Sequence, residues 1–262
     1  MALPFREQLE AIGAVFTREN GQLRICIGSG ISFGSMPSLA DLIALGLSSL
    51  EDGAASTAVF DRNAEQRGMR HRLGEDGYRV PDPLTLTEFR ALPIDARTRA
   101  CEQLCETYGT VFDELLQAYG SKRRLLDAIG FARFQQGQPR ASHHYLAFLL
   151  IEGVAEKVVT FNWDLLLERA VAAATGADPS ETMNIIKEKR AWVTRFDGPH
   201  KWMVKIHGCA SQYPDDCDAI ILTGHDLAGC GKIALRGQFL FLRADFGILS
   251  ESYRDGSLPL PV

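Results

Sequence analysis

The sequence predicts an α/β protein with a Rossmann-like, doubly wound and mostly parallel sheet that carries a helical insertion. Short apolar runs alternate with segments of helical periodicity, which is typical of a parallel sheet flanked by helices. The first run, residues 23–27, stops abruptly at a glycine-rich turn, as a buried parallel strand does. With 262 residues, 46% of them hydrophobic and 23% charged, the chain can bury a sizeable core, and we expect residues 1–262 to form one domain.

The first part of the chain contains a predicted helix, a strand and the start of a second helix. Residues 5–18 place apolar side chains at helical spacing and end at Asn20-Gly21, a helix stop signal. Residues 23–27 form the predicted strand. The hydroxyl of Ser38 can cap the helix that follows it.

The middle of the chain departs from this alternation. Residues 51–83 are polar and aperiodic, and we interpret them as an excursion from the sheet that includes a lid. Residues 86–134 regain helical periodicity, with breaks at Pro93 and Gly120. We therefore place an excursion and helical insertion at residues 51–135.

The alternation of strands and helices then resumes. Residues 142–152 predict a helix, residues 157–161 a strand and residues 165–171 a helix, which together form a βα unit. Further short apolar runs continue this alternation as predicted strands, and they lie at residues 183–186, 192–196, 202–206, 219–222 and 239–242.

Composition excludes several classes of function. The formal net charge is −5, and the basic residues are interspersed with acidic ones, so we expect no nucleic-acid partner. The sequence shows neither a signal-peptide core nor an apolar run of about 20 residues, so we expect a cytoplasmic protein that does not enter a membrane.

The cysteines give no pattern of a metal site. None of the six forms a Cys-x-x-Cys pair, so we expect reduced, buried thiols and no bound metal. Spacing alone leaves open a site built from Cys209, Cys217, Cys230 and a nearby histidine. The cysteines are Cys26, Cys101, Cys105, Cys209, Cys217 and Cys230.

The turn Gly28-Ser29-Gly30-Ile31-Ser32 is the first candidate binding element. A Gly-x-Gly directly after a strand lets backbone amides approach a pyrophosphate, and the N-terminus of the next helix adds partial positive charge. The third glycine of the usual dinucleotide fingerprint is missing. A purely structural turn therefore remains the alternative.

Polar residues also follow two later strands. Asn162 and Asp164 come directly after the strand at 157–161, and His207 with Gly208 ends the run at 202–206. Open α/β sheets bind ligands at the carboxyl ends of their strands. The alternatives are that Asn162 or Asp164 merely caps a helix and that His207 is structural.

Taken in chain order, these motifs resemble the bacterial SIR2-like branch of the sirtuin superfamily. The resemblance covers roughly residues 23–227, with the middle insertion unmatched. The matching segments are Gly28-Ser29-Gly30-Ile31-Ser32, Met36-Pro37-Ser38-Leu39, Thr160 to Asp164 with Leu166-Leu167-Glu168, and Lys205-Ile206-His207-Gly208.

The resemblance implies an NAD+ hydrolase that releases nicotinamide and ADP-ribose, with NAD as substrate, of a type found in antiphage defence. It implies that His207 is the general base, with an ordinary pKa of about 6.5 that suits neutral pH. Asn162 would orient water and ribose, and Asp164 would contact the nicotinamide carboxamide. The implied NAD-binding residues are Gly28, Ser29, Gly30, Ile31, Ser32, Pro37, Asn162 and Asp164.

Departures from the family pattern define two alternatives. Sirtuin deacylases carry a Pro-Asp-Phe-Arg stretch and two zinc-binding Cys-x-x-Cys pairs, and neither occurs here, which disfavours an NAD-dependent deacylase. The run at 239–242 leads into residues 243–247 without the Gly-x-Ser turn that touches the adenosine ribose. We therefore keep a non-catalytic NAD or ADP-ribose sensor as an alternative, and we expect self-association or a partner protein to cover this C-terminal edge.

Overall fold

The computed structural model describes residues 23–66, 68–78, 82–187 and 201–233. These ranges contain the candidate site residues at the three predicted strand ends. The predicted helix at 5–18, the apolar runs at 192–196 and 239–242, and the C-terminal segment at 243–247 lie outside the described residues.

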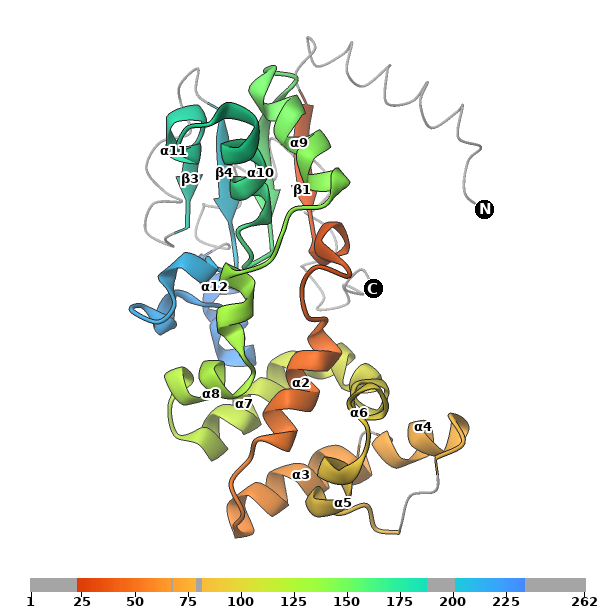
Figure 1. The fold of residues 1–262 in the computed structure, drawn as a ribbon. Coiled ribbons are helices and arrows are strands. Elements are labelled where there is room, and N and C mark those ends of the chain that lie inside the picture. The colour runs from red at the N-terminus through yellow and green to blue at the C-terminus, as the bar shows by residue number, and fades with distance from the viewer. Residues whose placement is uncertain (1–22, 67, 79–81, 188–200, 234–262) are drawn as a thin grey trace.

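The described chain forms an α/β fold around a four-stranded parallel sheet in the order β1-β2-β4-β3, as the sequence predicts (Figure 1). The central strand β2 pairs with both β1 and β4, so Thr160 lies opposite Ile27 on one side and Lys205 on the other. Because the strands are parallel, their carboxyl ends meet at one edge of the sheet. The strands are β1 (Leu23–Ile27), β2 (Ala155–Thr160), β3 (Asn184–Ile186) and β4 (Trp202–Lys205).

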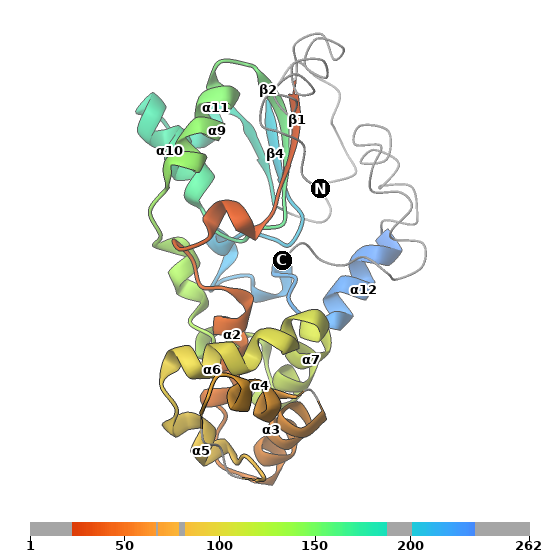
Figure 2. The same cartoon turned by 90° about the vertical axis from the view of Figure 1, so that its right-hand side faces the viewer.

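One face of the sheet is covered by α9 (Ala141–Ile151), α10 (Leu166–Thr175) and the short α11 (Pro179–Thr182), which lie on the same side in Figure 2. Val158 of β2 and Met203 of β4 face these helices and share their apolar core. Strands β1, β2 and β3 follow one another in one direction across the sheet. Because connections between parallel strands are right-handed, the helices that link these strands lie on the same face.

A helical body lies beyond the end of the sheet at which the site residues gather (Figure 1). Its first helix, α2 (Leu39–Ser48), begins at Ser38, whose hydroxyl accepts from the Asp41 amide in a reciprocal capping box. The predicted breaks also hold, because α5 ends before Pro93 and Gly120 ends α7 in a left-handed conformation. The other elements of the body are α3 (Ala54–Gln66), α4 (Met69–Glu75), α5 (Leu86–Ala91), α6 (Ile94–Cys101), η2 (Glu102–Thr107), α7 (Tyr108–Tyr119), α8 (Lys122–Ala128) and η3 (Phe131–Gln135).

Two predictions about secondary structure are wrong. Much of residues 51–83 is helical, as α3 and α4, and not an aperiodic excursion. Val59, Phe60, Ala64, Met69 and Leu73 bury these mainly polar helices in the core of the helical body, and such tertiary packing supplies most of the stability of a helix in a protein.

The apolar run at 219–222 does not form a strand. The short η6 (Cys217–Ala219) ends there, and Ile220 and Leu222 bury their side chains in the helical core. Burial of an apolar run thus needs no strand pairing here. The remaining elements are η5 (Ala210–Gln212) and α12 (Gly224–Ile233). Within the described part of the chain, no helix has the length and apolar character to span a bilayer.

Candidate functional site

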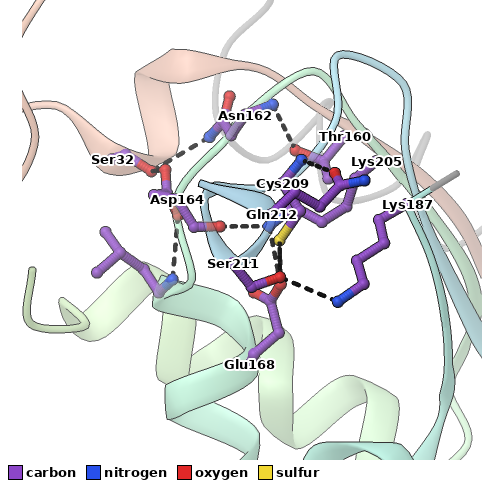
Figure 3. Close-up of polar contacts among 11 residues, drawn as sticks. Ser32, Thr160, Asn162, Asp164, Glu168, Lys187, Lys205, Cys209, Ser211 and Gln212 are labelled. Carbon is purple, nitrogen blue, oxygen red and sulfur yellow. Dashed lines mark hydrogen bonds and ion pairs between the residues drawn. The ribbon is translucent and has the colours of Figure 1, made fainter. Parts of the chain in front are cut away.

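The buried hydroxyl of Ser32 connects the turn at residues 28–32, called the glycine loop from here on, to the end of β2. Ser32 Oγ donates to Asp164 Oδ2 at 2.7 Å and accepts from Asn162 Nδ2 at 3.2 Å (Figure 3). Ser32 lies in η1 (Ser29–Ser32), and its two partners follow β2. The structure therefore brings Ser32 together with two residues that lie 130 and 132 positions later in the sequence.

Asn162 connects the two loops and does not act as a helix cap. Its Nδ2 donates to the carbonyl of Gly28 at 3.1 Å as well as to Ser32 Oγ, and its own amide donates to Thr160 Oγ1 at 3.0 Å. Both hydrogens of the side-chain amide are engaged in this way. The group that half-buried Asn162 can offer to a ligand is its carbonyl oxygen Oδ1.

Asp164 combines a contact to the start of α10 with a contact to the glycine loop. Its Oδ1 accepts from the amide of Leu166 at 3.1 Å, at the start of α10, while Oδ2 accepts from Ser32. The side chain is buried. One carboxylate oxygen therefore accepts from the first amide of α10, whose N-cap residue is Leu165, and the other oxygen accepts from the glycine loop.

Lys205, the first residue of the Lys-x-His-Gly motif, is a buried structural cation. Its Nζ lies 2.8 Å from Glu168 Oε1 and also donates to the backbone carbonyl of Asp164. Burial alone would lower the pKa of Lys205, but the attraction of the Glu168 carboxylate outweighs it and holds the pKa above its ordinary value. The ion pair ties the end of β4 to α10 and to the Asp164 loop.

Gly208 turns the chain immediately after His207. Its φ of +83° lies in the region that favours glycine, and an added Cβ would stand 2.4 Å from the carbonyl oxygen of Ala219. The carbonyl of His207 accepts from Ile221 N at 2.9 Å and from Trp163 Nε1 at 3.0 Å. The His-Gly corner is therefore fixed by backbone geometry.

The imidazole of His207 is half-buried against two aromatic rings. It packs edge-on to Phe161 at 5.3 Å and tilted to Trp163 at 6.3 Å between ring centroids. Desolvation lowers the pKa of His207 to about 4, and a hydrogen bond with the Phe161 backbone opposes this effect. The expectation of an ordinary pKa near 6.5 is therefore wrong, and the hydrogen bonds that join Ser32, Asn162 and Asp164 do not include this ring.

The glycine loop has open space beside it. A Cβ added at Gly28 or Gly30 would meet nothing within 4 Å, and Ser29 and Gly30 are exposed. Packing within the protein therefore does not require these glycines, whereas a ligand could approach the backbone closely here. Ile31 packs against the apolar core between the sheet and helices α9 and α10.

The glycine loop contains a short helix that the sequence did not predict. Residues Ser29–Ser32 of the loop form the 3₁₀ helix η1, and α2 begins at Leu39 after the predicted Ser38 cap. Pro37 lies between these two helices, just before the Ser38 cap. The N-terminus of α2 is therefore separated from the glycine loop by the intervening segment.

Two further features concern ligands. Among the described residues, no group of three or more His, Cys, Asp and Glu side chains could hold a metal ion, and the Cys230 side chain lies outside them. A shallow hollow of about 540 Å³ lies beside α9 and α10. None of its lining residues belongs to the hydrogen-bonded group of Ser32, Asn162 and Asp164. It is lined by Gln136, Gln138, Pro139, His144, Arg169 and Ala173.

His143 is a polar residue of this region that sequence reasoning missed. Its imidazole is buried in α9, with Nε2 3.3 Å from Ser32 Oγ and Nδ1 3.1 Å from the amide of Arg140. The position in α9 gives no sign of this contact, because Ser32 lies 111 residues away. The local signal is the Arg140 to His143 spacing, at which the imidazole can cap the helix.

Comparison with known proteins gives no family assignment. The chain matches no protein-family model and no curated protein sequence. The resemblance to SIR2-like proteins therefore rests on the sequence motifs alone.

Proposed function

We propose that this chain is an NAD+ hydrolase that binds NAD at the carboxyl edge of the sheet and cleaves its nicotinamide–ribose bond. The observation that carries the proposal is the hydrogen-bonded group of Ser32, Asn162 and Asp164, which unites the glycine loop with the end of β2. His207 follows the adjacent strand β4. This is the edge at which open α/β sheets bind ligands.

In the proposed reaction, water attacks the ribose carbon that carries nicotinamide. The carbon–nitrogen bond breaks, its electron pair leaves with nicotinamide, and a proton of the water passes to the His207 imidazole. The products are nicotinamide, ADP-ribose and a proton. Asn162 Oδ1 accepts a hydrogen bond from the ribose or the water, where charge develops in the oxocarbenium-like transition state.

The remaining site residues hold the substrate. Open space lies beside Gly28 and Gly30, and in the proposal the backbone of this loop binds the phosphates of NAD there. Asp164 uses one lone pair of each oxygen on Leu166 and Ser32, and a carboxylate retains further acceptor capacity for the carboxamide of nicotinamide. Following the SIR2-like resemblance, we place this activity in antiphage defence.

The depressed pKa of His207 shapes its role as a base. At neutral pH the imidazole is neutral and ready to accept a proton, but its conjugate acid is costly in this apolar setting. The same observation favours the second candidate, a sensor that binds NAD or ADP-ribose without cleaving it. A weak base that lies outside the Ser32 hydrogen-bond group would be dispensable for binding.

The test is release of nicotinamide by purified protein incubated with NAD, with and without an acetylated peptide. We expect release without the peptide, and we expect His207→Ala to abolish it with little change in melting temperature. His71→Ala, which removes a largely exposed imidazole in the helical body, is the matched control and should keep full turnover. Release only with the peptide would indicate a deacylase, whereas binding of NAD without release would indicate a sensor.

A further inference from the structure

The buried imidazole of His143 has both ring nitrogens engaged. The backbone amide of Arg140 points at Nδ1, and the hydroxyl of Ser32 lies next to Nε2. The residue is 1% exposed, so it cannot itself touch a ligand at the surface of the loop. Any role in the site must pass through Ser32.

The hydrogen-bond partners fix the tautomer of His143. A backbone N–H can only donate, so Nδ1 must accept and carries no proton. In a neutral imidazole the proton then lies on Nε2, which donates to Ser32 Oγ. Burial lowers the pKa of His143 and so favours this neutral form, although the nearby Asp164 carboxylate opposes the shift.

The tautomer in turn fixes the direction of the Ser32 hydroxyl. Ser32 Oγ accepts from His143 Nε2 and from Asn162 Nδ2, which fills both of its acceptor positions. Its single proton must then point to Asp164 Oδ2, 2.7 Å away. The hydroxyl has no rotational freedom left, and the glycine loop is held against the end of β2 in one arrangement.

We propose that His143 is a positioning residue for the NAD cleavage proposed above, acting through Ser32 to hold Asn162 and Asp164 in register with the glycine loop. The inference rests on that proposed function. It assigns to His143 a role at the site in addition to its capping of α9, and the two roles use different nitrogens.

Two amide variants separate these roles. His143→Gln places an amide nitrogen near the position of Nε2 and keeps a donor to Ser32, but it gives up the acceptor for Arg140. His143→Asn places its oxygen near Nδ1 and keeps the cap, but it cannot reach Ser32. We expect the Asn variant to lose on the order of tenfold in kcat at little changed KM, because misplaced groups cost rate more than binding. The Gln variant should keep turnover near wild type and show the lower melting temperature.

Ser32→Ala completes the experiment. It should lose at least as much kcat as His143→Asn, because it removes the hydroxyl that contacts His143, Asn162 and Asp164. The double variant should lose no more than Ser32→Ala alone, because the effect of His143 passes through this hydroxyl. Nitrogen NMR of the wild-type imidazole should show the Nε2–H tautomer at neutral pH. This measurement holds even if a variant fails to fold.

The outcomes are distinguishable. If wild type releases nicotinamide and His143→Asn matches it while His143→Gln fails, His143 only caps α9 and the inference is wrong. An Nδ1–H tautomer, or additive losses in the double variant, would also overturn it. If wild type neither binds nor cleaves NAD, the proposed function itself is wrong.

Discussion

Replacing His207 by glutamine should remove a large part of the acid sensitivity of the fold. In the unfolded chain a histidine titrates near an ordinary pKa of about 6.5, whereas packing against Phe161 and Trp163 lowers the pKa of His207 to about 4. Between these two pKa values, the imidazole is protonated in the unfolded state and neutral in the folded state. Stability is complete above the unfolded value and is lost as the pH falls from about 6.5 toward 4.

The size of the effect follows from the two values. At about 1.4 kcal/mol per pH unit, the full difference corresponds to about 3 kcal/mol, of which about 2 kcal/mol is lost by pH 5. Urea unfolding of wild type and His207→Gln at neutral pH and near pH 5 measures this directly. Groups such as His143 and the carboxylates titrate in both proteins, so their contribution cancels in the comparison.

A proton NMR titration of the His207 ring provides the independent check. We expect a midpoint well below 6 in wild type and an acid limb of kcat/KM that lies near 4 to 5 instead of 6.5. Equal losses of stability in both proteins, together with a ring midpoint near 6.5, would refute the argument that the two aromatic rings desolvate His207.

Three further predictions concern the residues around the site. Asn162→Ala should lower kcat more than NAD affinity, measured by nicotinamide release and calorimetry, whereas equal losses would indicate a purely structural link to the Gly28 carbonyl. Gly208→Ala should lower the free energy of unfolding in urea by at least about 2 kcal/mol, because its Cβ would clash with a carbonyl at positive φ. Gly28→Ala is the control: its Cβ meets open space, and the change should be close to neutral. Similar values for the two variants would contradict this account of the turn. Lys205→Met should lower the free energy of unfolding by about 3 to 5 kcal/mol, because it leaves the Glu168 carboxylate buried without its cation. Adding Glu168→Leu should restore most of this stability. If it does not, the loss does not come from the carboxylate.

The strand ends could be predicted because their physical cause is local. The apolar runs at 23–27 and 202–206 stand out in the sequence, as strands of a parallel sheet do. The structure buries β4 along its length, but it leaves Cys26 of β1 exposed, so the expectation of a buried thiol is wrong at this position. Polar residues directly after such strands must gather at one edge of the sheet. Ser32, Asn162 and Asp164 meet there for this reason.

The features that were missed depend on contacts distant in sequence. Helix α3 is mainly polar, and only its packing against the helical core reveals that Phe60 anchors it. Nothing near His143 indicates Ser32 as a partner, and nothing near His207 indicates how far its ring is desolvated. Burial and long-range hydrogen bonding are properties of the assembled fold, so these pKa values could not be read from local spacing.

The helical body contributes to the wall of the site through Trp163. This indole packs against Phe131 and Phe134 at 5.7 and 5.6 Å between ring centroids, and its Nε1 donates to the His207 carbonyl. The carbonyl of Trp163 accepts from the amide of Ala210, whose side chain lies in the helical core. The position of His207 therefore depends on packing between the insertion and the segment after β4, as well as on the strand that precedes it. A substitution that loosens the packing of Phe131 and Phe134 would therefore shift the His207 imidazole, because Trp163 packs against both phenylalanines and against His207.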